Sequence, residues 1–497
     1  MPLASHDVLL AADLSGVRRS LLDAPYDLEI VDRIDRAAVN QRSLDREAAL
    51  DAVPGEAPAH IATRLFMLAN PEPPAMVERL FAMGDIDLLV DLGLLERTGE
   101  MLRAAVLVLP MEEGLIVSDF NHFIDGRAMR EDHVLGAGPA TQMLLRLVPR
   151  VPVDRVLDLG VGQGVQSLAA SEHAGHVIGT DLSPRALAAA ALTSRLNGRG
   201  NIELRRGDLY APVAGETFDM VIANPPFLIL PPINLAAVTS ADGGDTLMER
   251  AARGAPGLLR DGGWAIMMAS WHHRTPQDWA EKPRAWLEGC GCDAWIMHFD
   301  THTPAECTMK YRREFPNSPL SRLPREDWLA YYARIGAAQV TLGAFVLRKR
   351  PGPNWMRLER ASPDFNRPRA GRIVETIFEN ETFLSTHPRE ALLACRPKLE
   401  PTVEVEQRWG ADPEGGLAVT AAIVRHTAML QMPLNSSASV LRVLTQVDGT
   451  RTLGEIMDVV ADSMGIPREK LRVEGLPGLE VLAKRGFLRL TNGARTA

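Results

Sequence analysis

Lysine is scarce in this chain of 497 residues: only 6 of its 54 basic residues are lysine, and the first of them is Lys282. A nucleotide-binding P-loop requires the pattern GxxxxGK followed by Ser or Thr. The first half of the chain therefore has no P-loop, and the second half contains no match to the pattern.

Cysteine and long apolar runs are also in short supply. Four cysteines in this length do not form a disulfide-stapled scaffold. No run of 18 apolar residues is present, and the first residues lack the basic region of a signal peptide. We therefore expect a cytoplasmic protein that does not cross a membrane.

Acidic residues outnumber basic ones, with a net charge of 54 − 63 = −9. This balance disfavours a globally basic nucleic-acid-binding protein, although it leaves room for a local basic patch. The chain is 46% hydrophobic and 24% charged, so it can bury a core. At roughly 100–200 residues per domain, its length predicts two to four domains.

Residues 1–130 are predicted to form a helical domain. Apolar residues recur at i, i+3 and i+4 in APAHIATRLFML, EPPAMVERLFAM and DIDLLVDLGLLERTG, and two β-rich runs follow, MLRAAVLVL and GLIVSDF. Three helices and a β-hairpin are typical of a winged helix. Because no basic cluster accompanies them, a helical cap on the next domain is an equally good interpretation.

Residues 131–350 alternate strand and helix, which predicts an α/β domain with a mostly parallel sheet. The predicted helix after Asp181 begins with Ser183 as N-cap and Pro184 at the first helical position. Residues 351–433 open with the linker-like RPGPNW and read as a mixed, β-containing segment. Residues 434–497 predict three helices and a short strand.

A glycine-rich turn, Asp158 to Gly164 (DLGVGQG), joins the first predicted strand of the α/β domain to a helix. Glycines allow the backbone to approach a ligand closely at a helix N-terminus. The dinucleotide pattern GxGxxG fails because Val165 replaces its last glycine. Asp181 and Asp208 end the next two strands, at the edge where open α/β sheets bind ligands.

A second motif, Asn224-Pro225-Pro226-Phe227, follows the strand FDMVIA. Prolines lack an N–H group and end ladder pairing, so the chain leaves the sheet there. They also hold the Asn224 side chain and a backbone carbonyl in fixed geometry. The alternative is an ordinary strand-ending turn.

Residues 154–230 resemble class I S-adenosylmethionine methyltransferases, because DLGVGQG, TDLSPRALAAA, GDLY and IANPPF follow in the family's order and spacing. NPPF is similar to the [ND]PP[YFW] motif of an N-methyltransferase subgroup. This subgroup contains release-factor glutamine, guanine-N2 rRNA and adenine-N6 DNA methyltransferases. The resemblance implies a Rossmann-like, seven-stranded methyltransferase domain, here with helical or winged-helix additions at both ends.

The resemblance also implies roles for individual residues. The cofactor would be S-adenosyl-L-methionine, with S-adenosyl-L-homocysteine as product. Asn224 and Pro225 would accept hydrogen bonds from the methyl-accepting nitrogen, with Pro226 fixing the turn and Phe227 stacking on the planar group. Residues near the cofactor would be Asp158 at its amino-acid end, Gly160 and Gly162 under its methionine part, Asp181 at the ribose, and Asp208 with Leu209 at the adenine. Gly164, Leu182 and Asn224 would also bind the cofactor.

Two features of the resemblance are less regular. Gln163 stands where relatives often carry Ser or Cys. The segment from Asp132 to Thr141 (DHVLGAGPAT) corresponds to a loop that closes over the cofactor carboxylate in relatives, and it reads equally well as a domain connector.

Three other groups of residues have two interpretations each. Cys290, Cys292, His298, His302 and Cys307 suggest zinc, but their spacing fits no standard finger and part of it lies in a predicted strand, so we expect no metal. Trp271-His272-His273 lines a substrate cleft or is structural. The basic residues before the last strand contact phosphates or an acidic peptide, or form a solvated loop: Lys310, Arg312, Arg313, Arg322 and Arg325.

The stretch after Leu434 resembles the PqqD-type peptide-binding winged helix, and its alternative is a structural or dimerising winged helix. Residues 151–350 contain 21 basic and 21 acidic residues, so they carry no overall basic field. These observations favour S-adenosylmethionine-dependent N-methylation of a peptide or protein side chain, or of a small molecule. The alternatives are an RNA or DNA base as acceptor, and a non-catalytic cofactor-binding module. The sequence leaves the oligomeric state open.

Overall fold

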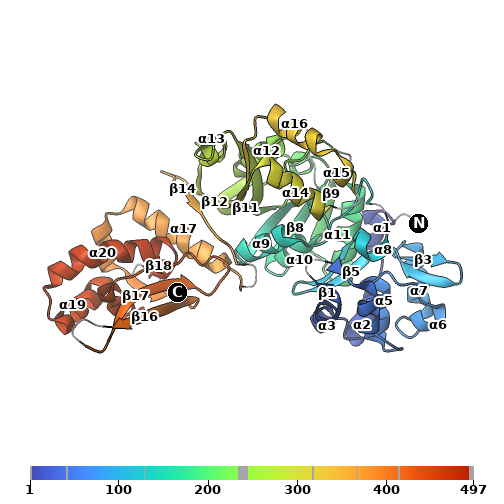
Figure 1. Cartoon of the computed structure of the whole chain (residues 1–497), viewed down its shortest axis with the longest axis horizontal. Helices are drawn as coiled ribbons and strands as arrows, with labels where there is room; N and C mark the ends of the chain where they lie inside the picture. Colours follow the sequence, from blue (N-terminus) through green and yellow to red (C-terminus); the bar gives the residue numbers. More distant parts are fainter. Residues whose placement is uncertain are drawn as a thin grey trace. The chain divides into compact units, whose positions relative to one another are not determined.

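The computed structural model describes residues 3–40, 43–127, 129–232, 244–315, 318–364, 367–411 and 415–491. The chain divides into two compact units (Figure 1), which are interleaved along the sequence. The first contains Met1–Thr141, Val151–Cys290 and Asp300–Lys349, and the second contains Gln142–Arg150, Gly291–Phe299 and Arg350–Ala497. The domain boundaries expected near residues 130, 350 and 433 stay a prediction. No helix among the described residues is long and apolar enough to span a membrane.

The N-terminal part of the first unit consists of short helices followed by β-hairpins. Its helices are α1 (His6–Ala11), α2 (Ser15–Asp23), α3 (Leu28–Ala38), α4 (Arg46–Asp51), α5 (Pro58–Phe66), α6 (Pro74–Val77), α7 (Met83–Asp91) and α8 (His122–Asp125). Its antiparallel pairs are β1 (Val39–Asn40) with β2 (Ser43–Leu44), β3 (Leu95–Thr98) with β4 (Met101–Ala104), and β5 (Leu107–Met111) with β6 (Gly114–Ser118). The winged-helix interpretation of this region stays a prediction.

One expectation for this region is wrong. The helix predicted over DIDLLVDLGLLERTG ends at Asp91, because Gly93 adopts a left-handed conformation (φ 79°) that ends helices, and β3 follows. The β-rich run MLRAAVLVL contains two strands, β4 and β5. Between them the amide of Ala105 bonds to the carbonyl of Leu94 at 2.8 Å, which turns the chain out of the first hairpin.

The sheet predicted for the α/β domain is confirmed. Its strands are β7 (Val153–Leu159), β8 (Ala174–Asp181), β9 (Ile202–Arg206), β10 (Phe218–Ala223), β11 (Leu259–His273) and β13 (Gln339–Lys349), in the order β13-β11-β10-β7-β8-β9. All neighbours are parallel except β11 and β13. The C-terminal end of β12 (Cys292–His302) supplies a seventh strand, since Thr301 Oγ1 lies 3.0 Å from Thr341 Oγ1 on β13.

Helices cover this sheet, and Figure 1 shows α10 (Val165–Ala170) and α11 (Pro184–Leu196) beside β8. The predicted start of α11 is confirmed, because the Ser183 hydroxyl accepts a hydrogen bond from the Ala186 amide at 3.3 Å. The remaining helices of the domain are α9 (Pro139–Leu147), η1 (Ala211–Val213), α12 (Thr246–Leu258), η2 (Asp278–Ala280) and α13 (Glu281–Leu287).

The basic stretch before β13 is helical, and the expectation of a solvated loop is wrong in that respect. It forms α14 (Pro304–Glu314), α15 (Pro319–Arg322) and α16 (Arg325–Arg334), which we call the α14–α16 insertion. Its arginines are exposed. Beneath them lies an apolar cluster that includes Trp328 and Tyr332, both fully buried. The aromatic residues, spaced as on one helix face, account for the difference.

The second unit contains its own core. Its elements are β14 (Met356–Arg360), which pairs in parallel with β12, then α17 (Gly371–Thr386), η3 (Arg389–Ala394), β15 (Arg396–Leu399), β16 (Val403–Ala411), β17 (Leu417–His426), β18 (Leu434–Asn435), α18 (Ala438–Leu444), α19 (Leu453–Met464), α20 (Arg468–Lys484) and β19 (Leu488–Thr491). The three helices and short strand predicted after residue 434 are confirmed. They pack on the hairpin β16–β17 around buried side chains such as Val424, Ile456 and Phe487.

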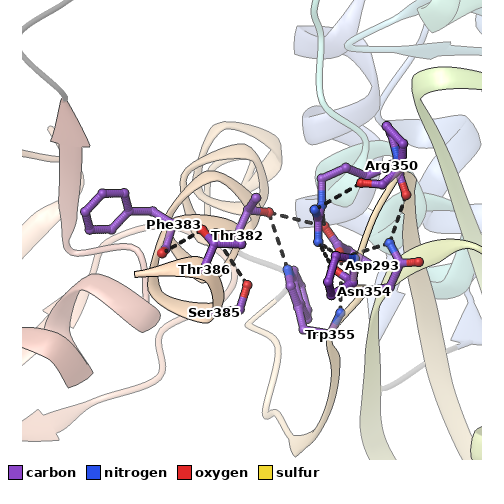
Figure 2. A network of polar contacts seen from close by, with 10 residues as sticks. Asp293, Arg350, Asn354, Trp355, Thr382, Phe383, Ser385 and Thr386 are labelled. Carbon is purple, nitrogen blue, oxygen red and sulfur yellow. Dashed lines mark hydrogen bonds and ion pairs between the residues drawn. The ribbon is translucent and has the colours of Figure 1, made fainter. Parts of the chain in front are cut away.

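A buried carboxylate, Asp293 on β12, organises the start of the second unit (Figure 2). Arg350 donates to it from Nε at 2.7 Å and from Nη2 at 2.9 Å. The Trp355 amide at 3.1 Å and the Thr382 hydroxyl at 3.2 Å also donate to it, as does Asn354 Nδ2 at 3.3 Å. Since the Asp293 side chain is fully buried, these donors balance the cost of removing its charge from water. The network therefore links β12, the RPGPNW segment and α17.

Removing this carboxylate should destabilise the second unit. We expect Asp293→Ala to lower its free energy of unfolding by about 3 kcal/mol, because the donors that surround Asp293 lose their acceptor. Differential scanning calorimetry of the full chain measures the change. Asp462→Ala, which breaks an exposed ion pair between α19 and Arg468 of α20 in the same unit, is the matched control and should leave the transition unchanged.

Candidate active site

The carboxyl ends of β7, β8 and β10 meet at one edge of the sheet. The turn after β7 is tied to β8, because the amides of Gly160 and Val161 both donate to the Thr180 carbonyl at 2.9 Å. The motif NPPF follows β10, which pairs directly with β7. The glycine-rich turn and NPPF, separated by about 60 residues in the sequence, are therefore neighbours in the fold.

Two glycines of the turn are required by conformation, and Gly164 is also required by space. Gly160 and Gly164 have φ angles of 75° and 81°, which side chains other than glycine rarely adopt. A Cβ atom at Gly164 would lie 3.0 Å from the Cα of Ala190 on α11. At Gly160 it would lie 3.5 Å from the Cα of Pro225, so this glycine brings the turn against the second motif.

Two predicted cofactor residues are acids beside this turn, of which Asp158 is buried and Asp181 is partly buried. Asp181 accepts hydrogen bonds from the amides of Gly162 at 3.0 Å and Ser183 at 2.8 Å. Asp158 is 1% exposed and accepts a hydrogen bond from the Ser167 hydroxyl at 2.7 Å. Burial raises the pKa of Asp181 and raises the pKa of Asp158 to about 7. Both carboxylates are thus costly to keep ionised, and a cation or hydroxyl donor from a ligand would offset that cost.

The other predicted cofactor residues lie nearer the surface. The Asp208 carboxylate forms an ion pair with Arg250 at 2.7 Å, with 55% of its side chain exposed. Leu209, which follows it, has a left-handed backbone (φ 44°). Leu182 is 64% exposed. Their roles at the adenine and ribose stay a prediction.

The amide of Asn224 has one satisfied end and one unsatisfied end. Its Nδ2 donates to the hydroxyl of Thr141 at 3.1 Å. Its Oδ1 is buried and has no hydrogen-bond partner. A buried acceptor without a partner costs about 1–3 kcal/mol, so such an atom is retained where a ligand supplies the donor. Phe227, which follows the two prolines, is 8% exposed, and its carbonyl accepts a hydrogen bond from the Ser270 hydroxyl.

Thr141 is the residue of this site whose role the sequence did not reveal. It ends the segment 132–141, and its carbonyl accepts a hydrogen bond from Gln166 Nε2 at 3.0 Å. The segment is held at its start by the Val134 amide, which donates to the Asp119 carboxylate at 2.9 Å. Of the two interpretations of this segment, the contact between Thr141 and Asn224 favours a part in the site.

The structure places the other candidate residues from the sequence in different surroundings. Trp271 and His273 are structural: the Trp271 indole donates to the Trp279 carbonyl at 2.5 Å, and the His273 ring lies 2.9 Å from the Thr341 hydroxyl. His272 lies 3.1 Å from Asp245, which also binds Lys282 at 2.8 Å. Within the described residues, no three His, Cys, Asp or Glu side chains form a group that could hold a metal ion.

The raised pKa of Asp158 predicts a pH dependence of stability. The folded protein binds this proton more tightly than the unfolded chain, in which the pKa is near 3.8. The resulting stabilisation is fully present below pH 3.8 and is lost as the pH rises to about 7. It amounts to at most about 4 kcal/mol at 1.36 kcal/mol per pKa unit.

Urea unfolding between about pH 4 and pH 7 measures this effect. Asp158→Asn cannot ionise, so its stability should fall less with rising pH than that of the wild type. Asp154→Asn is the control, because Asp154 lies on the same strand with 91% of its side chain exposed. Equal pH profiles for Asp158→Asn and wild type would contradict the titration of Asp158 in this range.

Two family models match the chain. The first, Methyltransferase small domain, matches residues 136–279, which include the glycine-rich turn and NPPF. The second, Domain of unknown function (DUF7059), matches residues 37–105. A solved structure, of ribosomal protein L11 methylase from Lactobacillus delbrueckii subsp. bulgaricus, is 17% identical, with 40% of this chain and 70% of that chain covered at a TM-score of 0.23.

Curated relatives also match part of the chain. The release factor glutamine methyltransferase of Xylella fastidiosa is 35% identical over 130 residues, covering 24% of this chain and 47% of the relative. The ribosomal protein uL3 glutamine methyltransferase of Bradyrhizobium diazoefficiens is 33% identical over 151 residues, covering 27% and 47%. The chain thus spans about half the length of these relatives. Residues 136–279 are thus similar to the Methyltransferase small domain, and part of the chain is similar to release factor glutamine methyltransferases.

Proposed function

We propose that this protein transfers a methyl group from S-adenosylmethionine to the side-chain amide nitrogen of a protein glutamine. The observation that carries the proposal is the buried, unpaired Oδ1 of Asn224, at the end of β10 and beside the glycine-rich turn. A protein that only senses the cofactor has no need of such an acceptor. A planar NH₂ group supplies the donor that this atom lacks.

The chemistry follows from the electronic structure of an amide. Its nitrogen is a poor nucleophile because the lone pair is delocalised into the carbonyl group. Hydrogen bonds from its N–H groups to Asn224 Oδ1 and to the Pro225 carbonyl localise that lone pair and orient it. Asn224 Nδ2 donates to the Thr141 hydroxyl, and this leaves the oxygen end of the Asn224 amide for the acceptor. The main contribution of the protein is therefore positioning, and a strong base is not needed before transfer.

The residues at the strand ends fit S-adenosylmethionine, which supplies a methyl group on a cationic sulfonium. Asp158 would face its amino-acid end, and Gly160, Gly162 and Gly164 would allow the backbone to approach it. Asp181 would accept from the ribose hydroxyls, with Leu182 beside it. Asp208 and Leu209 would lie at the adenine. The burial of Asp158 and Asp181 supports this assignment, since both carboxylates gain from donors of a ligand.

The relatives support a protein as acceptor, because their names specify glutamines of a release factor and of a ribosomal protein. Such substrates would place the reaction in the cytoplasm. A nucleic-acid acceptor gains no support from charge, since residues 151–350 have 21 basic and 21 acidic residues. Peptide recognition by residues 434–497 stays a separate prediction.

Asp181→Ala should weaken cofactor binding. A hydrogen bond to a charged group contributes about 1.5–3 kcal/mol, so the affinity for S-adenosylhomocysteine should fall roughly tenfold to over a hundredfold. Calorimetric titration measures it. Asp181→Asn removes the charge but retains an acceptor for the Gly162 amide. Comparing it with Asp181→Ala therefore distinguishes the effect of the lost charge from the effect of a loosened turn. A wild-type protein that does not bind S-adenosylhomocysteine would refute the proposed function.

Asn224→Ala should abolish turnover while the fold and cofactor binding are retained. The hydrogen bond from the acceptor nitrogen to Asn224 Oδ1 strengthens as that nitrogen gains positive charge, so it acts on kcat. Its loss should cost about 10²–10³ in rate, by comparison with other preorganised polar groups. The assay is single-turnover transfer of tritiated methyl groups to purified release factor and ribosomal protein uL3.

Two further variants test the role of the Asn224 amide. Asn224→Asp should be milder than Asn224→Ala, because a carboxylate still accepts from the substrate. Thr141→Val removes the bond that orients the amide and should lower the rate by less than Asn224→Ala. An Asn224→Ala protein that keeps more than about a tenth of the wild-type rate would mean that another residue orients the acceptor. Loss of S-adenosylhomocysteine binding in the same protein would mean that Asn224 is structural.

A further inference from the structure

Two consecutive tyrosines of α16 bond to the backbone on either side of the segment that follows NPPF. The hydroxyl of Tyr332 donates to the carbonyl of Ile229 at 2.9 Å. The hydroxyl of Tyr331 accepts from the amide of Gly244 at 3.0 Å. One turn of a single helix therefore holds positions 229 and 244, although residues 233–243 between them lie outside the described part of the chain.

Apolar packing strengthens the first of these attachments. Ile229 and Leu230 are 0% and 3% exposed, and both belong to the apolar cluster of the α14–α16 insertion. Trp328 and Tyr332 are members of the same cluster. The residues that follow NPPF are thus bound to the insertion both by apolar side-chain packing and by a backbone hydrogen bond.

The sheet holds the same segment from its other side. The Phe227 carbonyl accepts from the Ser270 hydroxyl on β11. The Asp245 carboxylate accepts from the amide of His272 on the same strand at 3.1 Å, and from Lys282 Nζ at 2.8 Å. Both ends of the segment are therefore fixed between β11 and the insertion.

The segment itself is stiff between Asn224 and Pro232. Four of these nine residues are proline, in the pairs Pro225-Pro226 and Pro231-Pro232. Proline fixes φ near −65°, which removes one of the two free backbone torsions at each of these four positions and so reduces the local freedom by which the chain absorbs a displacement. A shift at Ile229 is consequently transmitted to the Pro225 carbonyl and to the Asn224 side chain. A displacement of about 1 Å in a positioned reactant costs about 10²-fold in rate.

We propose that Tyr331 and Tyr332 are positioning residues for the methyl acceptor, and that the α14–α16 insertion acts through them to set the geometry of NPPF. This inference rests on the proposed function, because it assigns to NPPF the acceptor contacts described above. The tyrosines touch neither cofactor nor acceptor in this scheme. They act on the backbone at Ile229 and Gly244, and their hydroxyl groups form the hydrogen bonds by which they do so.

Tyr331→Phe, Tyr332→Phe and the double variant remove those hydroxyls and keep the rings. Tyr311→Phe is the matched control, because its ring is buried in the same insertion and stacks on Trp328. The full-length proteins are assayed by single-turnover methyl transfer to purified release factor, with rates normalised to folded protein. S-adenosylhomocysteine affinity is measured alongside by calorimetric titration.

We expect Tyr332→Phe to lower the single-turnover rate at least tenfold and the double variant to lower it further. S-adenosylhomocysteine affinity should stay within twofold of wild type, and Tyr311→Phe should match wild type in both measurements. A purely structural role predicts lower thermal stability with an unchanged rate per folded molecule. A Tyr332→Phe rate within twofold of wild type would therefore overturn the inference, and the single variants decide it if the double variant does not fold.

Hydrogen–deuterium exchange separates this inference from the proposed function. If wild-type protein methylates neither release factor nor ribosomal protein uL3, the proposed acceptors are wrong, and the tyrosines are then judged by exchange at the Phe227, Leu228, Ile229 and Leu230 amides. Exchange at least tenfold faster in Tyr332→Phe, with Tyr311→Phe at the wild-type rate, supports their hold on the segment. Equal exchange in Tyr332→Phe and wild type overturns it.

Discussion

The hydrogen bond from Asn224 to the hydroxyl of Thr141 is the interaction on which the geometry of the site depends. A primary amide has two chemically different ends, and rotation by 180° would exchange acceptor for donor. Thr141 binds the donor end, so the acceptor end is left buried and unpaired beside the glycine-rich turn. The short distance between Gly160 and Pro225 makes this arrangement useful, because it brings the two motifs into one edge of the sheet.

The site lowers the stability of the folded protein, and the packing of the remainder of the first unit compensates for this loss. It contains the buried carboxylate of Asp158, the partly buried carboxylate of Asp181 and an unpaired amide oxygen. Each of these features destabilises the folded protein when no ligand is present. Their concentration at one edge of a well-packed sheet is the pattern expected of a functional site, since local violations of packing rules gather where function requires them.

Much of the α/β domain was predictable because its signals are local. The strands β7 to β11 follow from short apolar runs bounded by turns, and the start of α11 follows from Ser183 and Pro184. The motif residues were predictable from their places at strand ends. Local patterns do not encode which distant residues meet: Thr141 contacts Asn224 across 83 positions, and Tyr332 contacts Ile229 across 103. The α14–α16 insertion was expected to be a loop because its exposed arginines dominate the local sequence. Its buried aromatic face, which favours a helix, is a weaker local signal.

The close approach of α11 to the glycine-rich turn makes two positions dependent on each other. Gly164 has no side chain, and a Cβ atom there would lie 3.0 Å from both the Cα and the Cβ of Ala190. A larger residue at position 190 would fill the same volume from the opposite side. Positions 164 and 190 are therefore expected to change little and only in concert during evolution, although neither side chain takes part in the chemistry.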